Sequence, residues 1–204
     1  MNTSPDVIDQ LAGIAPGSAL SRIRAQRPAA LENAQKSYDA LFNPAQPGTV
    51  LLEERFAIAY FVAGLHRTDA IAAFYREKLG YYARAGLVAA ISAEIKRGET
   101  TGPYGAYPTG PLSAEDKAGL HFGPDAGHAD VLGRLGAALV YAHLLVFRPR
   151  DASSAALQAL LNSGWSTDDI VTLSQLVAFL SFQIRVVTEL VAFGTAEQRA
   201  VAAE

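Results

Sequence analysis

The chain has 204 residues and a formal net charge of −3, and half of its residues are hydrophobic while 18% are charged. This composition is typical of a globular protein and excludes a disordered chain, and the weakly acidic balance offers no basic footprint for nucleic acid. The sequence contains no cysteine, which excludes disulfides and every mechanism that depends on a thiolate.

The N-terminal part of the sequence predicts three helices that are separated by proline and glycine. Ser4 and Pro5 are typical of a helix start, and we expect a short helix over residues 6–14. Two further helices are predicted over residues 18–24 and 28–42, the last of which ends at an Asn-Pro pair.

The central stretch, residues 50–80, reads VLLEERFAIAYFVAGLHRTDAIAAFYREKLG and predicts two helices joined by a tight break. The first helix opens on an acidic pair at 53–54, which suits the positive end of the helix dipole. From Phe56 to Leu65 it is apolar all round, which indicates a core helix. Thr68 and Asp69 carry oxygens that can accept from the free N–H groups at the start of the second helix.

The second half of the chain predicts a loop and two long helices. Residues 99–111 contain three glycines and three prolines, which favour a loop, and we expect Tyr104 and Tyr107 to pack it down or to line a pocket. Ser166 begins a capping box in which an aspartate replaces the usual glutamate, and Gly194 is the predicted C-terminal cap. The main predicted helices are 50–65, 69–83, 128–147 and 166–193.

The last of these helices carries two apolar rows. The core-facing row has steps of three and four residues, and it consists of Ile170, Leu173, Val177, Leu180, Ile184, Val187 and Val191. The second row consists of Phe179, Phe182 and Val186. Because one domain can hardly bury both rows, we expect the protein to form a homo-oligomer.

A weak internal repeat relates the two halves of the chain. The acidic pairs Glu53-Glu54 and Asp168-Asp169 both stand at a helix start, and nine residues later come Val62-Ala63 and Val177-Ala178. The pattern indicates two related helical units around one core, and we expect a single domain over residues 1–204.

The helix pair at 50–80 resembles the core helix pair of the carboxymuconolactone decarboxylase and alkylhydroperoxidase D family. In the peroxidase branch of that family the motif runs glutamate, eleven residues, Cys-x-x-Cys, three residues, histidine. Its four positions fall here on Phe56, Thr68, Ile71 and Tyr75. The resemblance implies an all-α, alkylhydroperoxidase D-like fold, with 50–83 as the first core helix pair and 128–193 as a second, weaker unit.

The same resemblance implies a cysteine-free member of the peroxidase-related, two-unit branch of the family. We expect no thiol peroxidase activity, because none of the four chemical residues of the motif is present. The chain would then bind a small apolar molecule or serve as a structural oligomer. The alternative is a cofactor-free enzyme similar to the lactone decarboxylases of the family, which would use His66 and Asp69 with Arg67. The sequence leaves open whether the chain is an enzyme.

The remaining histidines, His121, His128 and His143, lack the H-x-x-x-H spacing of two ligands on one helix face. We therefore expect no metal site and no cofactor, and we interpret His143 as a hydrogen-bonded core residue. The longest uncharged apolar stretches, 135–147 and 170–184, are shorter than the roughly 20 residues of a membrane span. With no signal-peptide pattern at the N-terminus, the sequence favours a cytoplasmic protein without membrane or nucleic-acid partners.

Overall fold

The computed structural model describes residues 6–201, with side chains up to residue 196, and every regular element of this part is a helix. The all-α class expected from the sequence is thereby confirmed, whereas Ser4 and Pro5 lie outside the described residues. The α-helices are α1 (Val7–Ala12), α2 (Ala19–Ala25), α3 (Pro28–Phe42), α4 (Leu52–Leu65), α5 (Asp69–Gly80), α6 (Leu87–Gly98), α7 (Ala129–Leu132), α8 (Leu135–Phe147), α9 (Ser154–Asn162) and α10 (Thr167–Val201). Three short 3₁₀ helices join them: η1 (Pro111–Glu115), η2 (Ala126–His128) and η3 (Pro149–Asp151).

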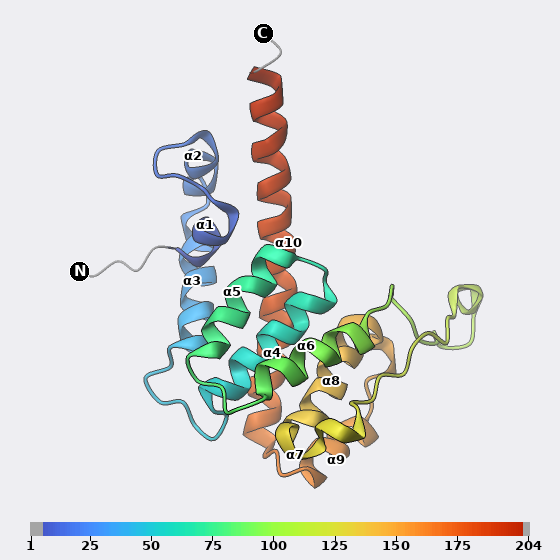
Figure 1. Cartoon of the computed structure of the whole chain (residues 1–204). Helices are drawn as coiled ribbons and strands as arrows, with labels where there is room; N and C mark the ends of the chain where they lie inside the picture. Colours follow the sequence, from blue (N-terminus) through green and yellow to red (C-terminus); the bar gives the residue numbers. More distant parts are fainter. Residues whose placement is uncertain (1–5, 202–204) are drawn as a thin grey trace.

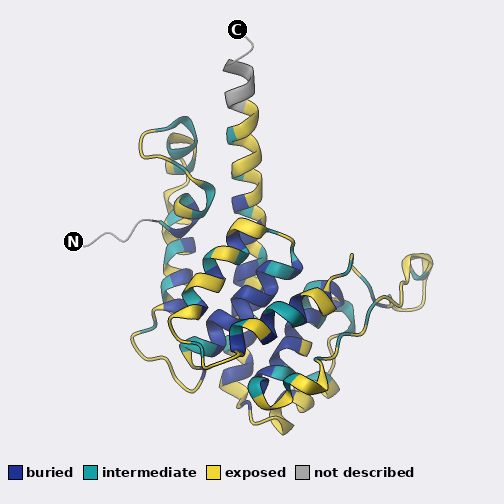
Figure 2. Cartoon of the chain, viewed as in Figure 1, coloured by how far each residue is buried: buried dark blue, intermediate teal, exposed yellow. Residues whose placement is uncertain are grey.

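Helix α4 lies at the centre of the fold and contacts α5, α6, α8 and α10 (Figure 1). Every residue from Glu54 to Ala63 is buried, as expected of a helix that is apolar all round. Figure 2 shows this helix almost entirely in the buried colour, together with the part of α10 that passes behind it. The two apolar helices therefore supply the centre of the core.

The N-terminal helices pack on one side of this centre. The predicted helix over 28–42 is confirmed to the residue as α3. Asp6 caps α1 by accepting from the N–H groups of Ile8 and Asp9 at 3.0 and 2.9 Å, and Arg24 of α2 forms an ion pair with Asp6 at 2.8 Å. Helices α1 and α3 in turn contact α10, so the N-terminal segment belongs to the same core.

The prediction of one continuous helix over 128–147 is wrong. Helix α7 ends at Leu132 and α8 begins at Leu135, and the segments on the two sides are bent by 109°. The break is at Gly133, whose φ of 52° and ψ of −133° are readily reached only by a residue without a Cβ atom. A glycine at this position therefore makes a corner, which brings Arg134 to the start of α8.

The prediction of a C-terminal cap at Gly194 is also wrong, because α10 continues through this residue to Val201. A Cβ atom at position 194 would lie 3.1 Å from Cδ1 of Leu20. The glycine therefore leaves room for the side chain of Leu20 from α2. Residues 202–204 lie outside the described part.

The predicted core face of α10 is buried from Ile170 to Val187, whereas Val191 is 46% exposed. The second predicted row requires a correction. Phe179 is only 8% exposed, because α3 places the ring of Tyr38 at 6.5 Å from its own ring. Phe182 is 48% exposed, so the unburied face of the helix passes through Phe182 but not through Phe179.

By length and composition alone, the segment Thr167–Ala196 of α10 could span a membrane, because an 18-residue window within it has a mean hydropathy of 1.8. In this structure 39% of that window is buried inside the protein, and the core helix of a soluble protein has the same character. The cytoplasmic location stays a prediction.

Candidate functional site

A groove with a volume of about 860 Å³ runs along α10, between this helix, the end of α8 and the loop that follows α6. The volume is in the range of small-molecule sites. Most of its lining is apolar, with a few polar side chains among it: His66, Gly102, Pro103, Leu145, Val146, Phe147, Pro149, Ser174, Val177, Ala178, Ser181, Phe182, Arg185 and Val186.

His66 is the main polar group of the groove, and it directly follows the last residue of α4. Burial lowers the pKa of His66, and the positive charge of Arg185 lowers it further, so the imidazole is neutral at pH 7. Its Nε2 atom is buried and has no hydrogen-bond partner within the described part of the chain. Since buried polar atoms are nearly always paired, this nitrogen is a hydrogen-bonding group that the described protein leaves unused, on a residue that lines the groove.

The residues proposed to act with His66 are not in the groove. Asp69 is the exposed first residue of α5, and Arg67 is exposed at the turn with a φ of 55°. Among the described residues, neither side chain forms a hydrogen bond or an ion pair with His66. The charged residue that accompanies His66 in the groove is Arg185 of α10, which the sequence analysis did not select.

The loop after α6 forms one wall of the groove through Gly102 and Pro103. Tyr104 fixes this loop, because its N–H donates to the carbonyl of Phe147 at 2.6 Å. Its ring lies so close to Gly119 that a Cβ atom there would be 2.1 Å away. Of the two roles expected for this tyrosine, packing the loop down is therefore the one observed.

Tyr107 also packs the loop rather than lining the groove. The guanidinium of Arg150 stacks over its ring at 3.7 Å from the centroid, in a cation–π contact.

The four positions of the peroxidase motif are placed as follows. Phe56, Ile71 and Tyr75 are buried, and Thr68 is half-buried. The rings of Phe56 and Tyr75 both pack against Phe42, with centroid distances of 5.0 and 5.3 Å. Phe56 and Tyr75 therefore belong to a packed aromatic part of the core.

Thr68 occupies the N-cap position of α5, but its hydroxyl does not cap that helix. It donates instead to the carbonyl of Ala63 at 3.1 Å, so the expected acceptance from the α5 N–H groups does not occur. The reason is local: the chain reverses tightly at Arg67, which brings both the N–H and the hydroxyl of Thr68 to the carbonyl of Ala63 near the end of α4.

Tyr75 donates its hydroxyl to Oε1 of Gln183, at 2.5 Å, inside the core. Burial raises the pKa of this phenol well above its ordinary value, so the group remains protonated and can donate this hydrogen bond. The Nε2 atom of Gln183 is buried without a partner among the described residues. Tyr75 thus connects α5 to α10.

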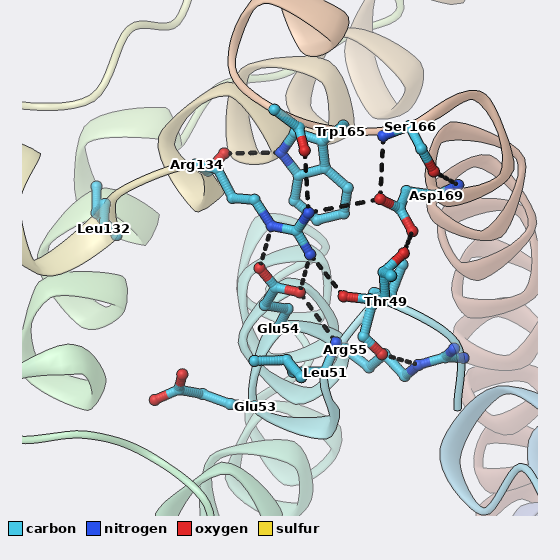
Figure 3. A network of polar contacts seen from close by, with 12 residues as sticks. Thr49, Leu51, Glu53, Glu54, Arg55, Leu132, Arg134, Trp165, Ser166 and Asp169 are labelled. Atoms are coloured by element: carbon cyan, nitrogen blue, oxygen red, sulfur yellow. Dashed lines mark hydrogen bonds and ion pairs between the residues drawn. The ribbon is translucent and has the colours of Figure 1, made fainter. Parts of the chain in front are cut away.

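A polar network joins the starts of α4, α8 and α10 around Arg134 (Figure 3). The guanidinium donates to both oxygens of Glu54, at 2.6 and 2.7 Å, and to Oδ2 of Asp169, at 3.4 Å. It also stacks on Trp165, 4.4 Å from the ring centroid, and donates to the carbonyl of Thr49 at 2.7 Å. These contacts position helices, because each polar atom of the network is used within the protein.

Glu94 and His128 form a second polar pair that the sequence analysis did not select. Glu94 is fully buried, and its Oε1 lies 2.5 Å from Nδ1 of His128 and accepts from the N–H of Asp125 at 2.9 Å. The pair fastens the segment before α7 to α6. The interpretation of His143 as a core residue is confirmed, since it is 2% exposed and its Nε2 lies 3.0 Å from the carbonyl oxygen of Gly98.

Comparison with protein-family models, curated proteins and solved structures finds no match for this sequence. The resemblance to the carboxymuconolactone decarboxylase and alkylhydroperoxidase D family, and the two-unit organisation that it implies, therefore stay predictions.

Proposed function

We propose that this protein binds a small, mainly apolar molecule in the groove along α10 and has no thiol peroxidase activity. The observation that carries the proposal is His66, which lines a groove of about 860 Å³ and whose buried Nε2 atom has no hydrogen-bond partner among the described residues. Apolar walls with a few placed polar groups are the usual form of a small-molecule site. A bound molecule would pair its single hydroxyl or carbonyl group with His66 and lay its apolar part along Phe147, Val177 and Val186.

The proposal is tested with two aromatic probes that differ by one hydroxyl group, naphthalene and 1-naphthol. We expect 1-naphthol to bind more tightly, because a hydrogen bond to His66 contributes about 1 kcal/mol, or roughly fivefold in affinity. In a His66→Phe variant the two probes should bind equally. The measurement is ligand-observed NMR titration, and His121→Phe, at an exposed histidine outside this groove, is the matched control.

A second variant tests the place of binding. Ser181→Trp puts a bulky side chain into the groove and should abolish binding of both probes while the helical circular dichroism spectrum is retained. Binding that survives Ser181→Trp, or a preference for 1-naphthol that survives His66→Phe, would contradict the proposal.

The alternative is a cofactor-free enzyme of the lactone decarboxylase kind. One observation favours it: a histidine kept neutral by burial is the form that a general base requires. The acid partner proposed for it, Asp69, is exposed on α5, so an enzyme would have to take its second group from the substrate or from Arg185. Release of CO₂ from a lactone carboxylate that is lost in His66→Phe, but retained in Asp69→Asn, would support this alternative.

A further inference from the structure

Helix α10 has one face that no other part of the described protein covers, and seven residues are regularly spaced along it. Its residues are spaced in alternating steps of four and three, and all of them are exposed: Val171, Gln175, Ala178, Phe182, Arg185, Glu189 and Ala192. This is the spacing of the contact positions of a coiled coil. We call these seven residues the exposed seam of α10.

The seam carries large apolar side chains that are exposed to solvent. Val171 and Phe182 are 52% and 48% exposed, and Phe193, which flanks the seam, is 67% exposed. Figure 2 shows exposed residues on both sides of the C-terminal part of α10, where the helix extends away from the central core. Exposed large apolar side chains that gather on one face of a helix favour an interface there.

The two charges of the seam indicate what covers it. Arg185 and Glu189 lie four residues apart, and neither forms an ion pair within the described part of the chain. A second copy of α10 that runs parallel would place arginine opposite arginine, which is unfavourable. A copy that runs antiparallel, with a two-fold axis at the level of Val187, places each Arg185 opposite the Glu189 of the other copy.

We propose that two copies of this chain pair through an antiparallel contact of the Phe182–Ala192 part of their exposed seams, held by these two reciprocal Arg185–Glu189 ion pairs. The contact is isologous, which means that each copy uses the same surface. In the same register, Phe193 of one copy lies across from Ser181 and beside Phe182 of the other. Those two residues line the groove, so the second copy covers part of its mouth. This pairing goes beyond the proposed ligand binding and does not depend on it.

The test is a charge exchange measured by sedimentation equilibrium of the full-length chain at low ionic strength, where exposed charges are least screened. We expect the unchanged protein to have twice the chain mass of 21.6 kDa at micromolar concentration. Arg185→Glu and Glu189→Arg should each weaken the dimer by roughly tenfold or more, because each single change creates two like-charge pairs. The double variant restores both pairs and should return the dissociation constant to near its original value.

The matched control is Lys36→Glu on α3, which also disturbs an exposed pair at i,i+4, with Glu32, and should leave the dimer unchanged. A monomer of 21.6 kDa for the unchanged protein at micromolar concentration overturns the proposal. It is also overturned if the single variants associate as tightly as the unchanged protein, or if the double variant stays as weak as the single ones. Binding of the unchanged protein as a monomer to phosphatidylcholine vesicles, in a flotation assay, would assign the seam to a membrane surface instead.

Discussion

Glu54 and Asp169, at the starts of α4 and α10, share one guanidinium, that of Arg134. Each carboxylate also has the same local role. Glu54 accepts from the backbone N–H of Leu51, and Asp169 accepts from that of Ser166, both at 3.0 Å and both three residues back. The two acidic pairs that repeat in the sequence therefore lie at equivalent helix starts, and one arginine connects them.

Removal of this arginine is expected to destabilise the fold. Arg134→Met leaves two carboxylates, whose side chains are 7% and 5% exposed, without their cation. Loss of one member of a buried ion pair costs about 3–5 kcal/mol, and we expect the lower end because Arg134 itself is 25% exposed. Urea unfolding measures the change, with the exposed Lys36→Met as the control; a loss below about 1 kcal/mol would contradict the structural role.

The stability of the protein should fall in acid partly through Asp169. Burial raises the pKa of Asp169, but hydrogen bonds from Thr49 and Ser166 and the charge of Arg134 outweigh it and lower the pKa below its ordinary value of 3.8. A lowered pKa in the folded state stabilises the fold at pH values above 3.8, and this contribution is lost as the pH falls through the folded value.

The measurement is the free energy of unfolding in urea between pH 5 and about 2.5. Asp169→Asn should be less stable at pH 5 and should lose less stability on acidification than the unchanged protein. Asp168→Asn, at the exposed neighbouring residue, should follow the unchanged curve. Equal pH dependence in all three proteins would rule out this contribution of Asp169.

Phe56 stands at the glutamate position of the peroxidase motif and fills the core. It is 3% exposed and stacks on Phe42 and Tyr82, at centroid distances of 5.0 and 5.5 Å. We expect Phe56→Ala to lower the free energy of unfolding by about 3–5 kcal/mol, as for other core aromatics. Tyr81→Ala, at a side chain that is 69% exposed, should cost less than about 0.5 kcal/mol. A small cost for Phe56→Ala together with new ligand binding would indicate an open pocket instead.

Thiol-dependent peroxidase activity should be absent, because the chain has no cysteine and the thiolate is the reacting group in that chemistry. Peroxide consumption coupled to a dithiol reductant should be no faster with the native protein than with a heat-inactivated sample. A clear excess over that background would require a different reacting group.

Local signals in the sequence predicted most of the helices. The features that the sequence analysis missed depend on contacts between residues that are far apart in the chain. The ends of α3 and the capping box at Ser166 and Asp169 depend on neighbouring residues, so they could be predicted. The corner at Gly133 could not, because a glycine in an apolar run fits either a helix or a left-handed turn, and tertiary packing decides. Arg134 was missed because its partners are 80 and 35 residues away.

The same limit applies to the candidate site. His66 and Asp69 are close in sequence, yet the reversal of the chain at Arg67 leaves the first in the groove and the second in solvent. Arg185, which does share the groove with His66, lies on a different helix far along the chain. Sequence proximity therefore identified the histidine but not its surroundings.

The loop wall of the groove has an evolutionary consequence. Gly102 and Pro103 belong to an irregular segment that is fastened by Tyr104 to Gly119 and Phe147. Because the other walls are core helices, changes in their side chains also affect folding, whereas surface loops tolerate insertions and substitutions. Related chains could thus acquire different ligand preferences by altering this segment alone, while the helical scaffold and the position of His66 are retained.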